Sequence, residues 1–266
     1  MTLRTLFFFS LFLFSHSLLA QIGAAKLLGG SDSLHFSDTI PEASENVSYM
    51  LPSSLETASI FHRSFNNVNK DSLFRPEDVI KAQTMSQKAM LLGVCYFDAA
   101  LLIVQKDGKG FLARLSTLKT LQKSMAMQFP ESLEKRFNKN RNNYDSLATI
   151  FSDLEMSSDE ELFDNDRSET SYLISVGIAM EALYLANRTP ALSAGKETSF
   201  FNDMGFLLQN EIWAGKSKSV KQEIVSSLVN VFKLMPATNT DNVSVKKNRV
   251  ALAIKTKTFR KNLVSK

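Results

Sequence analysis

Residues 89–104 read AMLLGVCYFDAALLIV, and this stretch decides the fold class of the chain. Asp98 is its only charged residue, and almost all the other side chains are apolar. A helix that is apolar all round is buried by neighbours on several faces. We therefore expect a central helix, which begins at Pro76, where proline and the acids after it favour a helix start, and runs to about Gln105.

A second stretch, residues 172–187, reads YLISVGIAMEALYLAN and again carries a single charge, Glu181. Segments with helical spacing of apolar residues surround the two stretches. The sequence therefore predicts an all-α, single-domain bundle of about seven helices, two of them central and apolar. The surrounding segments are residues 53–65, 111–128, 130–154, 200–215 and 219–235.

The predicted helix over residues 130–154 has an inward row of residues separated alternately by four and three positions. Such a row packs against another helix at a shallow angle, as in a bundle. Asn140 and Tyr144 are the polar members of the row, and we expect both to reach a hydrogen-bond partner in the core. Ser158 and Glu161 fit a capping box, which predicts a new short helix after the row. The row consists of Leu133, Phe137, Asn140, Tyr144, Leu147, Phe151 and Leu154.

The N-terminus has the pattern of a secretory signal, with a basic residue at Arg4, an apolar run over 6–14 and a small residue, Ala20, at a cleavage position. The apolar segment over 6–20 is shorter than the roughly twenty residues that span a membrane. Gln21 stands where a bacterial lipoprotein would need a cysteine, so we expect no lipid anchor. The pattern predicts an exported protein, periplasmic or secreted, that is cleaved near Ala20 and not lipidated.

The expected organisation is a signal peptide at 1–20, a polar leader at 21–50, the helical bundle at 51–236 and a C-terminal segment at 237–266. That last segment is predicted to be either a basic tail or a docked helix. The net charge of the chain is +4, and the basic excess is local, because residues 242–266 carry eight lysines and arginines and no acid. Such a segment can sit near an acidic surface.

Asp98 and Glu181 are the first candidates for a functional role. Each is the only charge in a long apolar helix, and a buried carboxylate has to be paired, hydrogen-bonded or protonated. Gly93 precedes Asp98 by five residues and Gly177 precedes Glu181 by four, and each glycine would allow two helices to approach closely. If the two helices pack together, both acids face one place in the core.

Asn140 and Tyr144 would join the two acids in a candidate polar pocket made of Asp98, Glu181, Tyr144 and Asn140. Two interpretations of the acids remain open. In one, each acid accepts hydrogen bonds and only stabilises the helix register. In the other, the pair binds a ligand or acts as a general acid and base, which requires a fixed separation beside a cleft.

The sequence predicts no catalytic residue, no metal site and no cofactor. His16, His35 and His62 have no paired spacing that would suit a metal. Cys95 lies inside the most apolar helix, where a thiol is usually inert, and as the only cysteine it excludes an intramolecular disulfide. The turn over residues 108–110 lacks the spacing of a nucleotide-binding glycine loop.

Several short motifs lie along residues 51–232: Leu92-Gly93-Val94, Asp98, Gly108 with Gly110, Phe137, Asn143-Tyr144-Asp145-Ser146-Leu147, Gly177 and Glu181-Ala182-Leu183-Tyr184-Leu185-Ala186. With these motifs the chain resembles a group of exported all-helical bacterial proteins that has no assigned activity. The resemblance implies a helical bundle. It offers no site residue to transfer.

These observations favour a non-enzymatic binding or scaffolding protein of the bacterial cell envelope, whose partner is another envelope protein or a small apolar ligand. One alternative is a hydrolase or lyase that uses Asp98 and Glu181. A second is a protein that contacts an anionic membrane surface weakly through residues 243–266. Nucleic acid is not expected as a partner, because an exported protein rarely meets it and the C-terminal segment has a single aromatic residue, Phe259.

Overall fold

A computed structural model describes residues 53–217, 222–235 and 242–265. All of them belong to one compact unit, Phe36–Lys266. The predicted signal peptide at 1–20 and the polar leader at 21–50 lie outside the described residues.

The described part of the chain is helical and contains no strand, which confirms the all-α prediction. A lone antiparallel bridge joins Phe65 to Ala191. The elements are α2 (Ser54–His62), the 3-10 helices η1 (Lys70–Ser72) and η2 (Pro76–Lys81), α3 (Met85–Val104), α4 (Gly108–Ser124), α5 (Glu131–Lys139), α6 (Tyr144–Asp164), α7 (Ser168–Ala186), α8 (Ala194–Ser217), α9 (Gln222–Phe232) and α10 (Asn242–Asn262).

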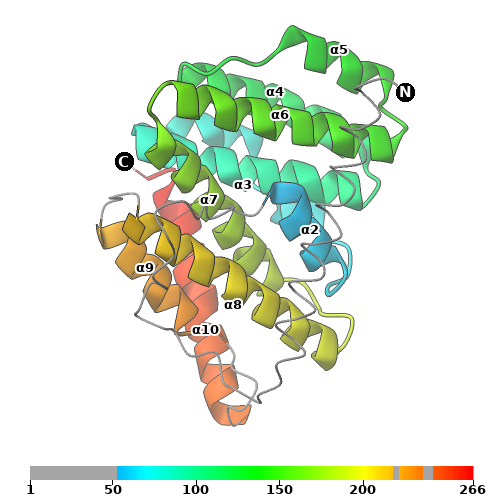
Figure 1. The fold of residues 1–266 in the computed structure, drawn as a ribbon. Coiled ribbons are helices and arrows are strands. Elements are labelled where there is room, and N and C mark those ends of the chain that lie inside the picture. Colours follow the sequence, from blue (N-terminus) through cyan, green and yellow to red (C-terminus); the bar gives the residue numbers. More distant parts are fainter. Residues whose placement is uncertain (1–52, 218–221, 236–241, 266) are drawn as a thin grey trace, which may run out of the picture. The chain divides into compact units, whose positions relative to one another are not determined.

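The two apolar helices α3 and α7 pack against each other at the centre and share the most extensive contact between any two described elements. Gly93 and Gly177 face each other across this contact. A Cβ atom built on Gly93 would overlap the carbonyl oxygen of Ile174, and one built on Gly177 would overlap that of Met90. α2, α4 and α6 also pack on α3, while α8 and α10 pack on α7 (Figure 1).

α3 is long and apolar enough to cross a membrane by its length and composition. In the structure, however, 78% of its most apolar window is buried inside the protein. Its apolar surface is therefore used in contacts with α2, α4, α6 and α7, as expected of the core helix of a bundle.

The predicted helix over residues 76–105 is two elements. Pro76 opens the 3-10 helix η2, the chain is extended at Ala82 and Thr84, and α3 begins at Met85. The hydroxyl of Thr84 accepts a hydrogen bond from the amide of Gln87, and the Gln87 side chain accepts one from the Thr84 amide at 3.1 Å. This capping box starts α3 at Met85, a position inside the single helix predicted over residues 76–105.

The predicted helix over residues 130–154 is also wrong as a single element. α5 ends at Lys139, and α6 begins at Tyr144, where the side chain of Asn143 caps its first turn by accepting from the Ser146 amide at 3.1 Å. Asparagine at this position competes with helix continuation, because its side chain satisfies an amide that a helix start leaves unpaired.

The capping box predicted at Ser158 is wrong too, because α6 continues through it to Asp164. The Ser158 hydroxyl is buried and donates to the carbonyl of Leu154 at 2.8 Å. It also lies 2.9 Å from the Tyr96 hydroxyl and accepts from the Gln122 side-chain amide at 2.7 Å. Ser158 therefore joins α6 to α3 and α4 instead of starting a helix.

The C-terminal segment, for which a tail and a docked helix were both open, forms α10 over residues 242–262. Leu252 and Thr256 of α10 are buried, as is Leu263 just after its end, and the helix packs on α7. Arg249 on α10 pairs with Glu197 of α8 at 2.8 Å. The first residues of the helix predicted over 219–235 lie outside the described residues, and α9 is described from Gln222.

Candidate functional site

Asp98 on α3 is fully buried and bound by the connection between α2 and α3. Its Oδ2 atom accepts a hydrogen bond from the backbone amide of Phe74 at 2.8 Å. The nearest cation is Arg114 of α4, whose Nη2 lies 4.0 Å from Oδ2 and whose Nη1 donates to the Phe74 carbonyl. Asp98 and Arg114 therefore hold both polar groups of the Phe74 backbone.

Glu181 on α7 is also buried and has a different arginine beside it. Nη2 of Arg260, from α10, lies 3.4 Å from Glu181 Oε1. The same guanidinium donates from Nη1 to the carbonyl of Ser72 at 2.8 Å. It also covers two rings, with its central carbon 4.3 Å from the centre of Tyr184 and 5.2 Å from that of Phe74. Arg260 thus links α10 to α7 and to the α2–α3 connection.

Sequence reasoning missed both arginines. A lone acid in an apolar helix requires a compensating group, but the partner lies 16 residues away for Asp98 and 79 residues away for Glu181. Only the tertiary packing brings these partners together. Two signals in the sequence could have pointed to them. A buried acid requires a cation nearby, and α4 and α10 each carry an arginine next to their apolar residues.

The two carboxylates are incompletely satisfied. Within the described residues, Asp98 Oδ1 and both oxygens of Glu181 have no hydrogen-bond donor. Burial raises the pKa of Asp98 to about 6, although Arg114 and Arg260 favour its charged form. Burial likewise raises the pKa of Glu181 well above its usual range; Arg260 opposes this rise, whereas the charge of Asp98 adds to it. The two acids therefore influence each other's charge.

These pKa shifts predict that the protein loses stability as the pH rises. Asp98 and Glu181 have raised pKa values, and burial also raises that of Glu155 on α6 to about 7. Above about pH 4 the unfolded chain has released protons that the folded protein still holds, so the free energy of unfolding falls with pH until the folded groups ionise. We expect a loss of about 4 kcal/mol or more between about pH 5 and pH 8 in urea denaturation, because each of these groups contributes about 1.4 kcal/mol per pH unit until it ionises in the folded protein. Constant or rising stability over that range would contradict the shifts.

Asn140 and Tyr144 do not join the two acids. Asn140 ends α5, half-buried, and its side chain donates to the carbonyl of Arg136 at 2.9 Å. Tyr144 opens α6, half-buried, and its ring lies beside Gly108 at the start of α4. The break between α5 and α6 turns both residues away from the core row on which they were predicted. Of the four residues predicted to form a polar pocket, the structure brings together only Asp98 and Glu181. Their nearest cations are Arg114 and Arg260.

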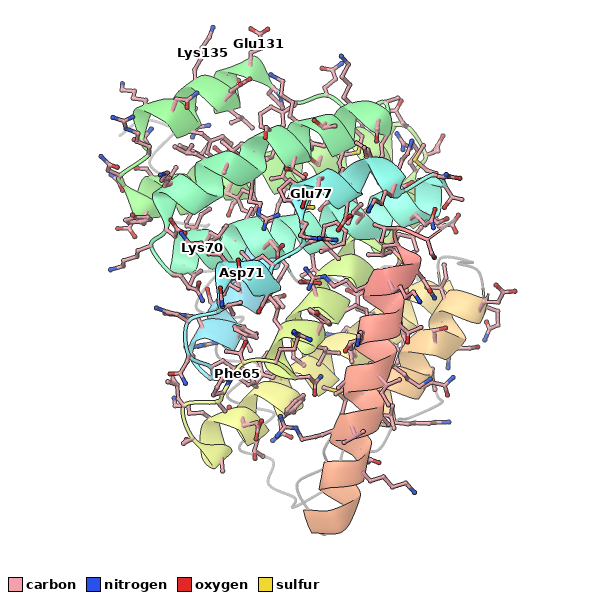
Figure 2. The ribbon with its side chains drawn as sticks, turned by 180° about the vertical axis from the view of Figure 1, so that it is seen from behind. Phe65, Lys70, Asp71, Glu77, Glu131 and Lys135 are labelled. Carbon is pink, nitrogen blue, oxygen red and sulfur yellow. The ribbon has the colours of Figure 1, made fainter. Side chains whose placement is uncertain are left out.

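Arg260 is one of the residues that line a pocket of about 260 Å³. Its walls come from the α2–α3 connection, the end of α7 and the last turns of α10. Figure 2 shows Lys70, Asp71 and Glu77 on that connection, on the face of the molecule along which α10 runs. The lining residues are Asp71, Ser72, Leu73, Phe74, Arg75, Asp78, Tyr184, Arg188, Lys257, Arg260, Lys261 and Val264.

The lining contains five basic and two acidic residues. Asp78 is already neutralised, because its carboxylate lies 2.9 Å from Arg75 Nη2 and 2.5 Å from Lys81 Nζ. Arg188, Lys257 and Lys261, by contrast, are exposed and form no ion pair with any described residue. The guanidinium of Arg188 lies 5.4 Å from the centre of the Tyr184 ring. The pocket therefore has an excess of positive charge that the described residues leave uncompensated.

Metal binding and thiol chemistry, which the sequence did not predict, concern the histidines, acids and single cysteine of the described residues. No group of three His, Cys, Asp or Glu side chains able to hold a metal ion occurs among them. His16 and His35 lie outside the described part. Cys95 is buried in α3, and burial raises the pKa of its thiol, which keeps the sulfur in its less reactive form.

No protein-family model, no curated protein and no solved structure matches this chain. The charge and geometry of the pocket are therefore the guide to its function.

Proposed function

We propose that this chain is an exported, non-enzymatic binding protein for a small anionic ligand, which it holds in the pocket between α7, α10 and the α2–α3 connection. The single observation that carries the proposal is the set of three cations, Arg188, Lys257 and Lys261, that meet at this pocket without a carboxylate partner among the described residues. Export, through the signal peptide proposed at 1–20, would place the pocket in the cell envelope or outside the cell.

An anionic ligand fits the pocket better than the apolar ligand suggested by the sequence. Guanidinium and ammonium groups bind carboxylate, phosphate and sulfonate oxygens through charge-assisted hydrogen bonds. Like charges that converge without a partner repel each other, and a bound anion relieves that repulsion. The volume of about 260 Å³ suits a small molecule.

The hydrolase or lyase alternative receives less support from the geometry. Neither Asp98 nor Glu181 is among the residues that line the pocket, whereas their contact residues Arg260 and Phe74 are. A general acid or base has to come within hydrogen-bond reach of its substrate. Since the two buried carboxylates do not line the pocket, they can act on a ligand only through neighbours such as Arg260.

Calorimetric titration of the mature chain with inorganic phosphate and with ethanedisulfonate tests the proposal. We expect saturable binding of at least one probe, and Arg188→Ala or Lys261→Ala should weaken it about tenfold, because each removes a charged contact worth about 1.5 kcal/mol. Asp71→Asn should tighten binding, since it removes an exposed negative charge from the pocket wall.

Lys135→Ala is the matched control, because Lys135 is an exposed lysine on α5, which contributes no residue to the pocket (Figure 2). It should leave affinity unchanged. Equal affinities in the wild type, Arg188→Ala and Lys261→Ala would overturn the proposal. Vesicles of phosphatidylglycerol form a separate arm: binding to them, with no binding of either soluble anion, would assign the cations to a lipid surface instead.

A further inference from the structure

Arg260 belongs to two sites at once. Its guanidinium lines the pocket, and it is also the cation nearest to the buried Glu181, at 3.4 Å. Its remaining contacts are with the Ser72 carbonyl and with the rings of Tyr184 and Phe74. Any anion that binds in the pocket therefore approaches the one charge that most favours ionised Glu181.

The two buried acids respond to that approach in a definite direction. A negative charge added beside Arg260 weakens the attraction that Arg260 exerts on Glu181 and Asp98, and it also repels both carboxylates. Burial limits screening by water, so the effect is larger than it would be at the surface. Protonation of one acid relieves the repulsion. Asp98 Oδ1 and the Glu181 oxygens have no donor among the described residues and so offer sites for a proton.

We propose that anion binding in this pocket is coupled to the uptake of one proton by the Asp98–Glu181 pair. The inference rests on the proposed function, and it assigns a role to two acids that are otherwise an unexplained cost to folding. The proton comes from the solvent and returns to it when the ligand leaves. Binding should therefore be tighter at lower pH.

The charged and titratable groups around the pair support this assignment. Burial keeps the Cys95 thiol protonated, and interaction with Glu181 and Asp98 raises the pKa of Arg260, so it stays charged. The hydrogen bond from Lys81 lowers the pKa of Asp78, so it stays ionised. Burial raises the pKa of both acids of the pair, that of Asp98 to about 6 and that of Glu181 well above its usual range. The other groups that face the pair or the pocket are Arg114 from α4, Tyr184 from α7, Arg188 just after α7, Lys257 and Lys261 from α10, and Asp71 and Arg75 from the α2–α3 connection.

The test is calorimetry of ethanedisulfonate binding to the mature chain in two buffers with different ionisation enthalpies. Sulfonates keep a constant charge near neutral pH, so any proton exchanged belongs to the protein. We expect net uptake of up to about one proton per ligand near pH 6.5, and affinity should rise by up to about tenfold for each unit fall in pH. Binding with no proton uptake would overturn the coupling.

Two variants identify the acids involved. The double variant Asp98→Asn with Glu181→Gln should still bind the anion and should lose the uptake. Glu155→Gln is the matched control, because it removes another acid whose pKa burial raises, a half-buried one that accepts from the Ser54 amide elsewhere in the protein. It should leave the uptake intact. Uptake that persists in the double variant would contradict the assignment.

The outcomes separate the two proposals. No binding of any anion by the wild type would contradict the proposed function and remove the basis of the coupling. Binding without uptake leaves the proposed function standing and contradicts the coupling alone. If the double variant does not fold by circular dichroism, Glu181→Gln alone serves the same purpose, with reduced uptake expected, and the wild-type buffer comparison remains decisive by itself.

Discussion

Replacement of Gly177 by alanine is expected to lower the free energy of unfolding by about 3 kcal/mol or more. The added Cβ would overlap the carbonyl oxygen of Met90 and lie 2.9 Å from its carbonyl carbon and 3.1 Å from the Cα of Gly93. These are backbone atoms of α3, so no side-chain rotation relieves the overlap. The two helices have to move apart at the contact that organises the bundle.

Urea or thermal denaturation measures this effect, and Gly93→Ala should behave in the same way, because its Cβ would meet the backbone of Ile174 and Gly177. Gly195→Ala is the matched control, since nothing lies within 4 Å of its added Cβ. In the first turn of α8, alanine should be neutral or stabilise by up to about 1 kcal/mol. Equal stability of Gly177→Ala and Gly195→Ala would contradict the close contact between α3 and α7.

Replacement of Arg260 by methionine is expected to destabilise the protein by about 3–5 kcal/mol near pH 8, where the loss leaves the buried Glu181 without its nearest cation. The penalty should shrink toward pH 5, because protonation of Glu181 removes the buried charge. Denaturation in the absence of ligand at both pH values measures the difference.

The double variant Arg260→Met with Glu181→Met should recover much of the lost stability, because it removes both charges from the core. Arg249→Met on the same helix is the control. Its partner Glu197 is partly exposed, so that pair should contribute about 1 kcal/mol or less. A penalty for Arg260→Met that is no larger than that for Arg249→Met would contradict the burial of the Arg260–Glu181 pair.

Some of this site was accessible from local patterns. A lone acid in an apolar helix predicts a buried carboxylate with a partner, and Gly93 and Gly177 predict a close approach of two helices. Both features depend on residues within one helix, and the structure shows both. The starts of α3 and α6 also had local signals, because Thr84 and Asn143 are good capping residues. The apolar periodicity continues across both positions, however, and it favoured the prediction of longer helices.

The identity of the partners was not accessible in this way. Many lysines and arginines compete for each acid in an unfolded sequence, and nothing local singles out Arg114 or Arg260. The choice depends on which helix faces are covered once α4 and α10 have packed, and packing is decided by the sum of many apolar contacts. The pocket has the same origin, because its walls come from three segments that are distant in the chain.

The amino-acid sequence by itself determined the helical class of the described chain, its two apolar central helices and the burial of one acid in each, since these follow from periodicity and from the absence of charge. Tertiary structure alone decided that α10 docks beside α7, that Arg260 reaches Glu181, and that uncompensated cations meet around a pocket. Helix periodicity acts over a few residues, whereas a charged site is made when distant segments are brought within a few ångströms of each other.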